Sequence, residues 1–422
     1  MKQIPIKNAI TEKISGEWGD EAGEEQGVVV IRTANFLNTG KINFSKLVRR
    51  KIDSKKVEKK KLITGDIIIE KSGGSPTQPV GRVVYFENPD GDTYLCNNFT
   101  TILRPDKTKV HPEFLFHVLH NNHKKGKTLR FQNKTTGIIN LKIDSYLDSE
   151  IQLPPLDEQI RIAHLLGKVE ALIAQRKQHL QQLDDLLKSV FLKMFGPSAS
   201  GYAGWPMVEI KDLAASHKGA MRTGPFGSNL LHSEFTEDGD VAVLGIDNAV
   251  KNRFAWSERR YITNKKYNEL SNYRVFPGDV IITIMGTIGR AAVVPDDVPL
   301  AINTKHLAAI TLNKDIAEPI FLSYSIHSSP FILNQFKSKN RGAIMSGLNL
   351  GLIKEIKLKH PPIKLQRKFA AIHTHVDDLK ISYQKNISDL EAMYGALSQQ
   401  AFKGELDLSS VLEMTKCDMN LA

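Results

Sequence analysis

Two long stretches of the chain repeat apolar residues in steps of three and four, as one face of an α-helix does. The first stretch runs from the proline pair at Pro154 to the stop signal Gly196-Pro197, and the second begins at the proline pair at Pro361. Such a heptad seam is typical of helices that bury one stripe against a partner helix. The seam positions are Leu166, Val169, Ile173, Leu180, Leu183, Leu187 and Val190 in the first stretch, and Val376, Tyr383, Ile387 and Leu390 in the second.

Short β-branched runs occur elsewhere in the chain and predict strands of half-buried sheets. They read GVVVIRTANF, DIIIEKSG and GRVVYF in the first half, and VAVLGI, DVIITIMG and GRAAVV in the second. Short helical patterns lie between them, at Pro112–Asn122 and Pro319–Ser328. The glycines of TGD at Thr64 and PGD at Pro277 predict tight turns into a strand. The predicted fold class is therefore α/β, in the mixed α+β sense.

An internal repeat organises these elements. VVVIRTAN from Val28 matches VAVLGIDN from Val241, and TGDIII matches PGDVII at the same offset of about 213 residues. In the long stretches the offset is constant from Pro154 to Phe195, so that Phe195 falls on Phe402 without a gap. The chain is one unit used twice. We expect a globule at 1–153, a central helix at 154–196, a second globule at 197–360 and a distal helix with a tail at 361–422.

The seam of each long helix needs a partner, and the nearest candidate is the other copy. A run of about 40 residues forms a rod of roughly 60 Å at the helical rise per residue. Two such rods packed antiparallel form a coiled coil with a pseudo-twofold internal repeat. The alternative is that each helix packs on its own globule.

Composition indicates a folded protein, with 41% hydrophobic and 24% charged residues among 422. No apolar run approaches the roughly 20 residues that span a bilayer, and the first residues lack the apolar segment of a secretory signal. We therefore expect a cytoplasmic protein without membrane contact. Cys96 and Cys417 are the only cysteines, which excludes a disulfide framework and a cysteine zinc cluster.

A formal charge of +11 favours polyanionic partners, and basic runs recur at matching places in both repeats. Asn, Gln and Arg side chains near these runs are suited to reading base edges. The candidate DNA contacts are Lys46, Arg49, Arg50, Lys51, Lys71, Ser75, Gln78, Lys124, Lys125 and Arg130 in the first repeat, and Arg222, Arg253, Arg259, Arg260, Lys265, Lys266, Lys339 and Arg341 in the second. A solvated basic face is the alternative.

The two repeats differ in the loops that are expected to read the DNA sequence. KSGGSPTQPVGR carries five extra residues relative to IMGTIGR, which places Lys71, Ser75 and Gln78 in a loop without a counterpart. We therefore expect the two reading surfaces to recognise different sequences. An acidic stretch around Glu17, Asp20 and Glu21 is expected to be a solvated loop.

A search for catalytic motifs finds none. The chain has no complete phosphate loop, no His-Glu-x-x-His, no Gly-x-Ser-x-Gly and no Gly-x-Gly-x-x-Gly after a strand. His373 and His375 face different sides of a helix, so a shared metal is not expected. We predict binding surfaces, with no catalytic residue, no metal and no cofactor.

Two globules, each followed by Pro-Pro-x-x-x-Gln and a long helix, together with PGDVIITIMGTIGR, TGPFGSNL and AFKGEL, resemble the specificity subunit of Type I restriction-modification systems over essentially the whole chain. The resemblance implies two target-recognition domains joined by a central and a distal conserved helix. It implies that each domain reads one half of a split double-stranded DNA target in the major groove, and that the helices set the spacing.

By the same resemblance, methyltransferase (modification) subunits, two in number, dock on this scaffold and bring S-adenosylmethionine for adenine methylation. Restriction subunits with a motor add ATP-dependent cleavage. The chain itself is then a non-catalytic DNA-reading and assembly subunit. Two alternatives stay open: a coiled-coil scaffold that binds nucleic acid without sequence preference or binds only protein, and an enzyme that acts alone.

Overall fold

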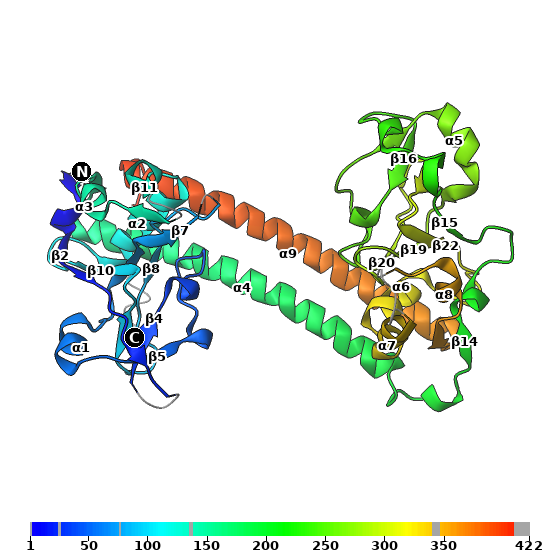
Figure 1. The fold of residues 1–422 in the computed structure, drawn as a ribbon, viewed down its shortest axis with the longest axis horizontal. Coiled ribbons are helices and arrows are strands. Elements are labelled where there is room, and N and C mark those ends of the chain that lie inside the picture. The colour runs from blue at the N-terminus through cyan, green and yellow to red at the C-terminus, as the bar shows by residue number, and fades with distance from the viewer. Residues whose placement is uncertain (1, 24–26, 76, 135–137, 340–346, 409–422) are drawn as a thin grey trace. The chain divides into compact units, whose positions relative to one another are not determined.

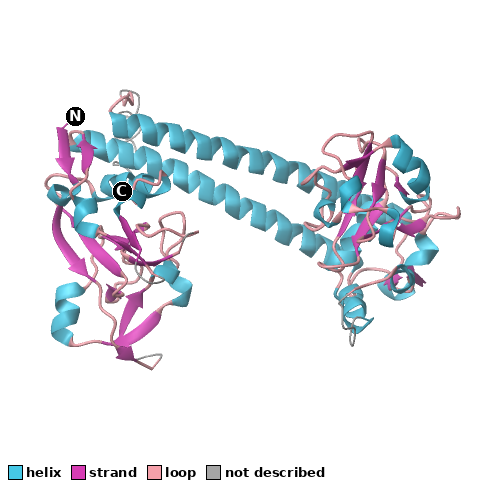
Figure 2. Cartoon of the chain, turned by 45° about the horizontal axis from the view of Figure 1, so that its top comes forward, coloured by secondary structure: helices cyan, strands magenta, loops and turns pink. Residues whose placement is uncertain are grey.

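The structure is a computed structural model that describes residues 2–23, 27–75, 77–134, 138–339 and 347–408. The chain divides into two compact units (Figures 1 and 2). Unit 1 comprises Met1–Lys177 and Lys385–Ala422, and unit 2 comprises Gln178–Gln384. Each unit thus contains a globular part and one half of each long helix, α4 (Leu156–Phe195) and α9 (Ile363–Lys403).

Unit 1 contains two four-stranded sheets. Their strand orders are β2-β10-β6-β8 and β3-β5-β4-β9, and the second sheet includes the parallel pair β4–β9. The strands are β1 (Lys2–Pro5), β2 (Ile10–Ser15), β3 (Asp20–Glu21), β4 (Val28–Ile31), β5 (Val48–Lys51), β6 (Ile67–Glu70), β7 (Ser72–Gly74), β8 (Val83–Tyr85), β9 (Tyr94–Cys96), β10 (Thr100–Pro105), β11 (Gln132–Lys134), β12 (Ile139–Leu141) and β13 (Glu150–Leu153). The shorter helices are α1 (Ser54–Lys60), α2 (Pro112–Lys124) and α3 (Ile143–Leu147).

Unit 2 repeats the order of the first sheet and of three strands of the second sheet, and its fourth strand joins the opposite edge of the second sheet. Its sheets are ordered β15-β22-β19-β20 and β17-β16-β21-β18, and again the second has one parallel pair, β16–β21. The strands are β14 (Met207–Glu209), β15 (Met221–Thr223), β16 (Val241–Leu244), β17 (Tyr261–Ile262), β18 (Arg274–Val275), β19 (Val280–Thr283), β20 (Ala291–Val293), β21 (Ala301–Asn303), β22 (Leu307–Ile310) and β23 (Lys357–Lys359). The shorter helices are α5 (Asn264–Leu270), α6 (Pro319–Ser328), α7 (Pro330–Lys339) and α8 (Leu350–Lys354).

Strands β6 and β19 are buried on both faces, which explains their continuous apolar sequences. In β6, Ile67 and Ile69 face the core that contains α2, whereas Ile68 faces the core of the second sheet. Strand β19 alternates in the same way between the core that contains α6 and a second core. The predicted mixed α/β fold, built twice, is confirmed.

Helices α4 and α9 pack against each other in antiparallel direction. In unit 2, the rings of His179 and Tyr383 lie 5.5 Å apart, and further along α4 the Asp184 carboxylate lies 2.6 Å from Lys380 Nζ. In unit 1, Lys177 Nζ on α4 lies 2.8 Å from the Glu391 carboxylate on α9. The predicted pairing of the two long helices is therefore confirmed.

The apolar seam serves the globular parts as well. Leu166 and Val169 belong to the same core as Phe114 of α2, and Leu187 and Val376 belong to the core of α6. The long helices therefore pack on the globular parts near their ends as well as on each other. The alternative, in which each helix packs on its own globule, thus holds in part. The seam residues Leu166, Val169, Leu187, Val376 and Ile387 are buried, and Ile173, Leu180, Leu183, Val190, Tyr383 and Leu390 are half-buried.

The TGD and PGD turns form as expected, with Gly65 and Gly278 at positive φ. The aspartates that follow them are buried. Asp66 binds both the Ile63 N–H and the Arg104 guanidinium. Asp279 accepts from the Phe276 N–H at 2.8 Å and from the Arg222 guanidinium. None of the helices in the described ranges combines the length and the apolar character that crossing a membrane requires.

Candidate nucleic-acid interface

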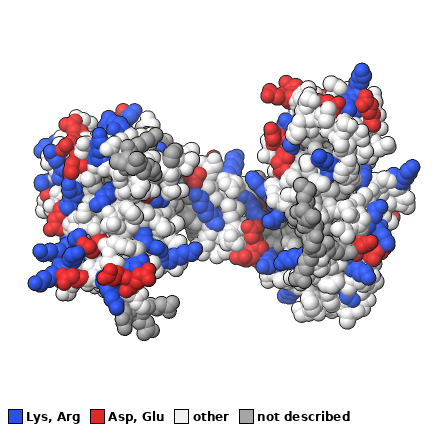
Figure 3. All heavy atoms as spheres, in the orientation of Figure 1, with Lys and Arg blue, Asp and Glu red and all other residues white. Residues whose placement is uncertain are grey.

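The first basic run of unit 1 forms strand β5 and helix α1. Arg50 on β5 lies over the Trp18 ring at 4.0 Å, and Arg49 pairs with Asp92 at 3.1 Å. Lys46 and Lys51, at either end of this strand, are exposed. In Figure 3 the lysines and arginines of unit 1 are interleaved with acidic side chains. The run therefore presents cations to solvent, but its two arginines are held by neighbours.

The acidic stretch before β4 is not simply solvated. The Glu17 carboxylate lies 2.7 Å from Lys60 Nζ and 3.2 Å from Lys56 Nζ, both on α1. The hydrogen bond from Lys60 is the main cause that lowers the Glu17 pKa. The expectation of a solvated loop is therefore wrong for Glu17, because the run of lysines on α1 needs a nearby anion to offset its own repulsion.

The loop that is peculiar to the first repeat contains a tight turn. The backbones of Ser75 and Gln78 bond each other at 2.9 and 3.1 Å, and the Gln78 side chain is exposed. Lys71 is half-buried and its Nζ lies 3.2 Å from Ser15 Oγ. Burial is the main cause that lowers the Lys71 pKa. The exposed Gln78 side chain accepts from the Arg82 guanidinium at 2.7 Å, and Lys71 is anchored to Ser15.

The second basic stretch of unit 1 follows helix α2. Lys124, Lys125 and Arg130 are exposed. Lys124 Nζ lies 5.5 Å from the centre of the Tyr394 ring on α9, and the Arg130 guanidinium lies 4.7 Å from the Phe131 ring. These contacts orient the cations without neutralising them.

Some of the predicted DNA-contact residues of unit 2 are exposed, and others are held in ion pairs. Arg259 and Lys265 are exposed, and the Arg259 guanidinium lies 5.3 Å from the Trp256 ring. Lys266 pairs with Glu234 at 2.9 Å and with Glu269 at 3.2 Å. Arg341 and the side chain of Lys339 lie outside the described residues.

Arg222 lies in the core of unit 2. It is 7% exposed and forms a charge pair with Asp279, which is fully buried. Its Nη1 also donates to Thr311 Oγ1 at 3.0 Å. DNA cannot reach this guanidinium without unfolding the sheet, so we remove Arg222 from the candidate contacts. Its role is to neutralise the aspartate of the PGD turn.

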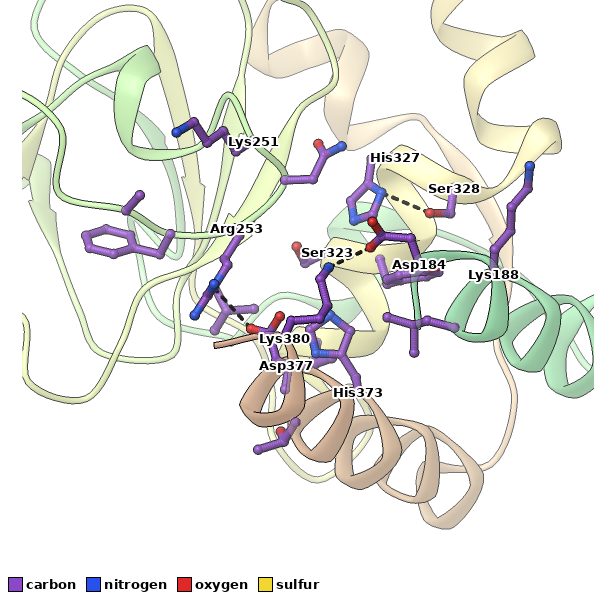
Figure 4. Close-up of a pocket in the computed structure, with 18 of the residues that line it drawn as sticks. Asp184, Lys188, Lys251, Arg253, Ser323, His327, Ser328, His373, Asp377 and Lys380 are labelled. Atoms are coloured by element: carbon purple, nitrogen blue, oxygen red, sulfur yellow. Dashed lines mark hydrogen bonds and ion pairs between the residues drawn. The ribbon is translucent and has the colours of Figure 1, made fainter. Parts of the chain in front are cut away.

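Arg253 lines a cleft of about 1020 Å³ between the loop 251–256 and helices α4, α6 and α9 of unit 2 (Figure 4). Its Nε lies 3.1 Å from Asp377 on α9, and Lys380 pairs with Asp184 across the same cleft. His327 is buried nearby, and its Nδ1 forms a 2.9 Å hydrogen bond with Ser328 Oγ. Burial lowers the pKa of His327 to about 4. The pair between Arg253 and Asp377 therefore holds the loop 251–256 on α9.

No group of three or more His, Cys, Asp or Glu side chains suited to a metal ion occurs within the described ranges. Sequence analysis missed most pairing partners of the basic residues, because partners such as Asp92 of Arg49 and Asp377 of Arg253 are distant along the chain. It did not assign a role to the buried Gln159 and Gln366 either, although the Pro-Pro-x-x-x-Gln spacing marks both.

Comparison with known proteins identifies the family. The model of the Type I restriction modification DNA specificity domain matches residues 11–184 and 202–392. The chain belongs to this family. It is a DNA specificity subunit of a Type I restriction-modification system, and this subunit is itself non-catalytic. The resemblance drawn from the sequence is confirmed.

Relatives with curated descriptions are distant but cover most of the chain. The putative type I restriction enzyme MjaX specificity subunit of Methanocaldococcus jannaschii is 21% identical over 81% of this chain and 79% of its own length. The type I restriction enzyme StySPI specificity subunit of Salmonella potsdam is 22% identical over 88% of this chain and 81% of its own.

Solved structures share the fold. The S subunit of a Type I restriction-modification system from M. genitalium has a TM-score of 0.58 at 16% identity, covering 95% of this chain and 96% of that one. A chain from a study of complex assembly and conformational transition of the type I R-M system has a TM-score of 0.57 at 17% identity, covering 96% and 98%.

Proposed function

We propose that this subunit recognises an asymmetric DNA target in two parts, one read by residues 1–153 and the other by residues 197–360. The observation that carries the proposal is that the two units share the first sheet and most of the second, but differ in the edge strand of the second sheet and in their surface loops. The tight turn at Ser75–Gln78 belongs to the first repeat, whereas Trp256 with the stacked Arg259 belongs to the second. A shared scaffold with unlike reading loops suits two unlike half-sites.

The exposed cations supply the sequence-independent part of this binding. Phosphate contacts from lysine and arginine release counterions and fix the register of the protein on the duplex. The exposed cations among the candidates are Lys46, Lys51, Lys124, Lys125, Arg130, Arg253, Arg259 and Lys265, and the neutral Gln78 is exposed as well. Arg49, Arg50, Lys71, Ser75, Arg260 and Lys266 are half-buried and are proposed to support these contacts, as Arg253 does by holding its loop on α9.

The long helices are proposed to join the reading domains and to carry the methyltransferase and restriction subunits of a Type I complex inside the cell. The relatives named as specificity subunits of Type I restriction enzymes support this partnership. An insertion of four residues after Gln178 tests the spacing that the resemblance implies. It should change the gap between the half-sites and leave their sequences unchanged.

The experiment that tests the proposal is selection from random duplexes by the full chain in complex with its methyltransferase subunits. We expect one bipartite duplex to outcompete random DNA by orders of magnitude. Recovery of a perfect palindrome contradicts the asymmetry. Binding without enrichment supports the alternative of a scaffold that contacts only phosphates, and methyl transfer or cleavage by the isolated chain supports an enzyme acting alone.

A further inference from the structure

A hollow of about 690 Å³ lies in unit 2 beside the sheet β17-β16-β21-β18. Three segments form its wall: the loop 225–235, the turn that follows β16 and the turn that follows β21. Its polar lining consists of His232, Asp247, Arg260, Thr304, Lys305 and His306. All of these residues belong to unit 2, and only Arg260 was among the residues predicted from sequence.

Two glycines allow the segments to approach this closely. A Cβ atom on Gly224 would lie 2.1 Å from the carbonyl oxygen of Asn303, so the TGPFGSNL loop can press on the β21 turn only with glycine there. A Cβ atom on Gly245 would lie 2.6 Å from Arg260 Nη2. The Thr304 N–H then donates to the Leu244 carbonyl at 2.9 Å. The pocket is therefore a built feature of the second repeat.

The pocket contains polar groups that the described residues leave without a partner. Arg260 Nε and Thr304 Oγ1 are both buried and make no hydrogen bond within the described ranges. The terminal nitrogens of Arg260 face Asp247, with Glu258 at 3.9 Å. A buried donor without a partner destabilises the empty pocket, and a ligand that accepts hydrogen bonds would relieve this.

The electrostatics of the pocket favour an anion. Lys305 is exposed, and it lines the pocket together with His232 and Arg260, whereas Asp247 is the one carboxylate in the lining described. Burial is the main cause that lowers the pKa of His306, and the charges of Lys305, His232 and Arg260 lower it further. The pocket thus already has a surplus of positive potential before His306 takes up a proton.

We propose that this pocket binds one backbone phosphate of the DNA target, with the Lys305 ammonium, Arg260 Nε and the Thr304 hydroxyl as donors. A phosphodiester offers acceptors that carry a negative charge and no donor, which complements both the unused donors and the positive potential of the pocket, whereas the acceptors of a base edge carry no net charge. The inference rests on the proposed function, because it assigns a phosphate contact to the second reading domain.

Bound phosphate also changes the protonation of the pocket. Its negative charge offsets the effect of Lys305, His232 and Arg260 on His306 and so raises the His306 pKa. Asp247 is already engaged by Arg260. Binding is therefore coupled to proton uptake, and the affinity for the target rises as the pH falls below the usual histidine pKa of about 6.5.

The test uses the full chain with its methyltransferase subunits and its selected duplex, in which each phosphate in turn is replaced by an uncharged methylphosphonate. For the unsubstituted chain we expect one position within one half-site to weaken binding about tenfold. Lys305→Gln should weaken binding to the natural duplex by a similar factor. The affinity of this variant should not fall further when the sensitive phosphate is replaced by methylphosphonate. Lys314→Gln, an exposed lysine of the same unit outside the pocket, is the control and should behave like the unsubstituted chain.

Additive losses in Lys305→Gln, or no sensitive phosphate in either half-site, would overturn the inference. His306→Gln provides a second readout and should flatten the pH dependence of affinity while His232 is retained. Inorganic phosphate distinguishes the other source of the same anion. If inorganic phosphate raises the His306 pKa but no methylphosphonate weakens binding, the pocket holds free phosphate and the DNA assignment fails. If the unsubstituted chain selects no duplex at all, the proposed function fails instead.

Discussion

Gln159, in the first turn of α4, accepts a hydrogen bond through its side-chain oxygen from the backbone N–H of His111 at 2.8 Å. Its amide nitrogen donates to the carbonyls of Lys109 and Pro154 at 3.1 and 2.9 Å. Gln366 in α9 makes the same three bonds, to the Glu318 N–H and to the carbonyls of Ile316 and Pro361, at 3.0, 3.1 and 2.8 Å. The glutamine of the Pro-Pro-x-x-x-Gln motif therefore clamps each long helix to the segment that precedes α2 or α6.

Replacing either glutamine by leucine should destabilise the unit that contains it by about 2–4 kcal/mol, because buried backbone groups lose their partners while the shape is nearly kept. Denaturant unfolding followed by circular dichroism measures this. Gln182→Ala, an exposed position on α4, is the control and should change stability by less than about 0.5 kcal/mol. A Gln159→Leu chain as stable as the unsubstituted one would show that the clamp is dispensable.

Substitution of Arg222 should lower the stability of the fold, whereas substitution of Arg259 should weaken DNA binding. Arg222→Ala leaves the buried Asp279 without its cation and should cost about 3–5 kcal/mol of stability. Arg259→Ala removes an exposed cation and should weaken target binding with little change in the unfolding midpoint. Thermal unfolding and duplex titration on both variants check this. Unchanged affinity of Arg259→Ala places that side chain away from DNA.

Charge placed on the helix seam should disrupt the pairing of α4 with α9. Leu180→Asp and Leu183→Asp, at half-buried seam positions, should prevent assembly with partner subunits, and Leu187→Asp, at a buried one, should also destabilise the core of unit 2. Leu186→Asp, at a position 52% exposed, is the matched control. Size-exclusion chromatography of the co-expressed subunits reads out assembly. A Leu180→Asp/Leu183→Asp chain that still assembles contradicts a structural role of the seam.

Three buried histidines should make the fold sensitive to acid. Burial lowers the pKa of His117 to about 4, of His120 to about 3 and of His327 to about 4. Between these values and the usual histidine pKa near 6.5, the unfolded chain binds more protons than the folded one, so stability falls as the pH decreases.

The free energy of unfolding measured at pH 7 and pH 5 tests this acid sensitivity. His120→Phe keeps a ring against Phe116 and should reduce the difference between the two values. An undiminished difference in that variant would show that His120 does not contribute.

Local patterns predicted the long helices, the strands β4, β6, β8, β16, β19 and β20 and the turns at Gly65 and Gly278, because each depends on neighbouring residues, and comparison of the two halves predicted the repeat. The pairing of charges could not be predicted in the same way. Asp279 lies 57 positions after Arg222. Asp377 is on helix α9, far along the chain from the loop that contains Arg253. The sequence around a basic residue is the same whether its side chain faces solvent or pairs with a carboxylate. Several residues predicted to contact DNA therefore form structural ion pairs instead.

The central claim is that each unit reads its own part of the target. The direct measurement is selection from random duplexes by the assembled complex, carried out with the natural chain and with a chain whose loop 71–79 has the shorter sequence of residues 284–287. We predict that one half-site changes or is lost while the other half-site is retained. Loss of both half-sites together, or retention of both, would contradict the account.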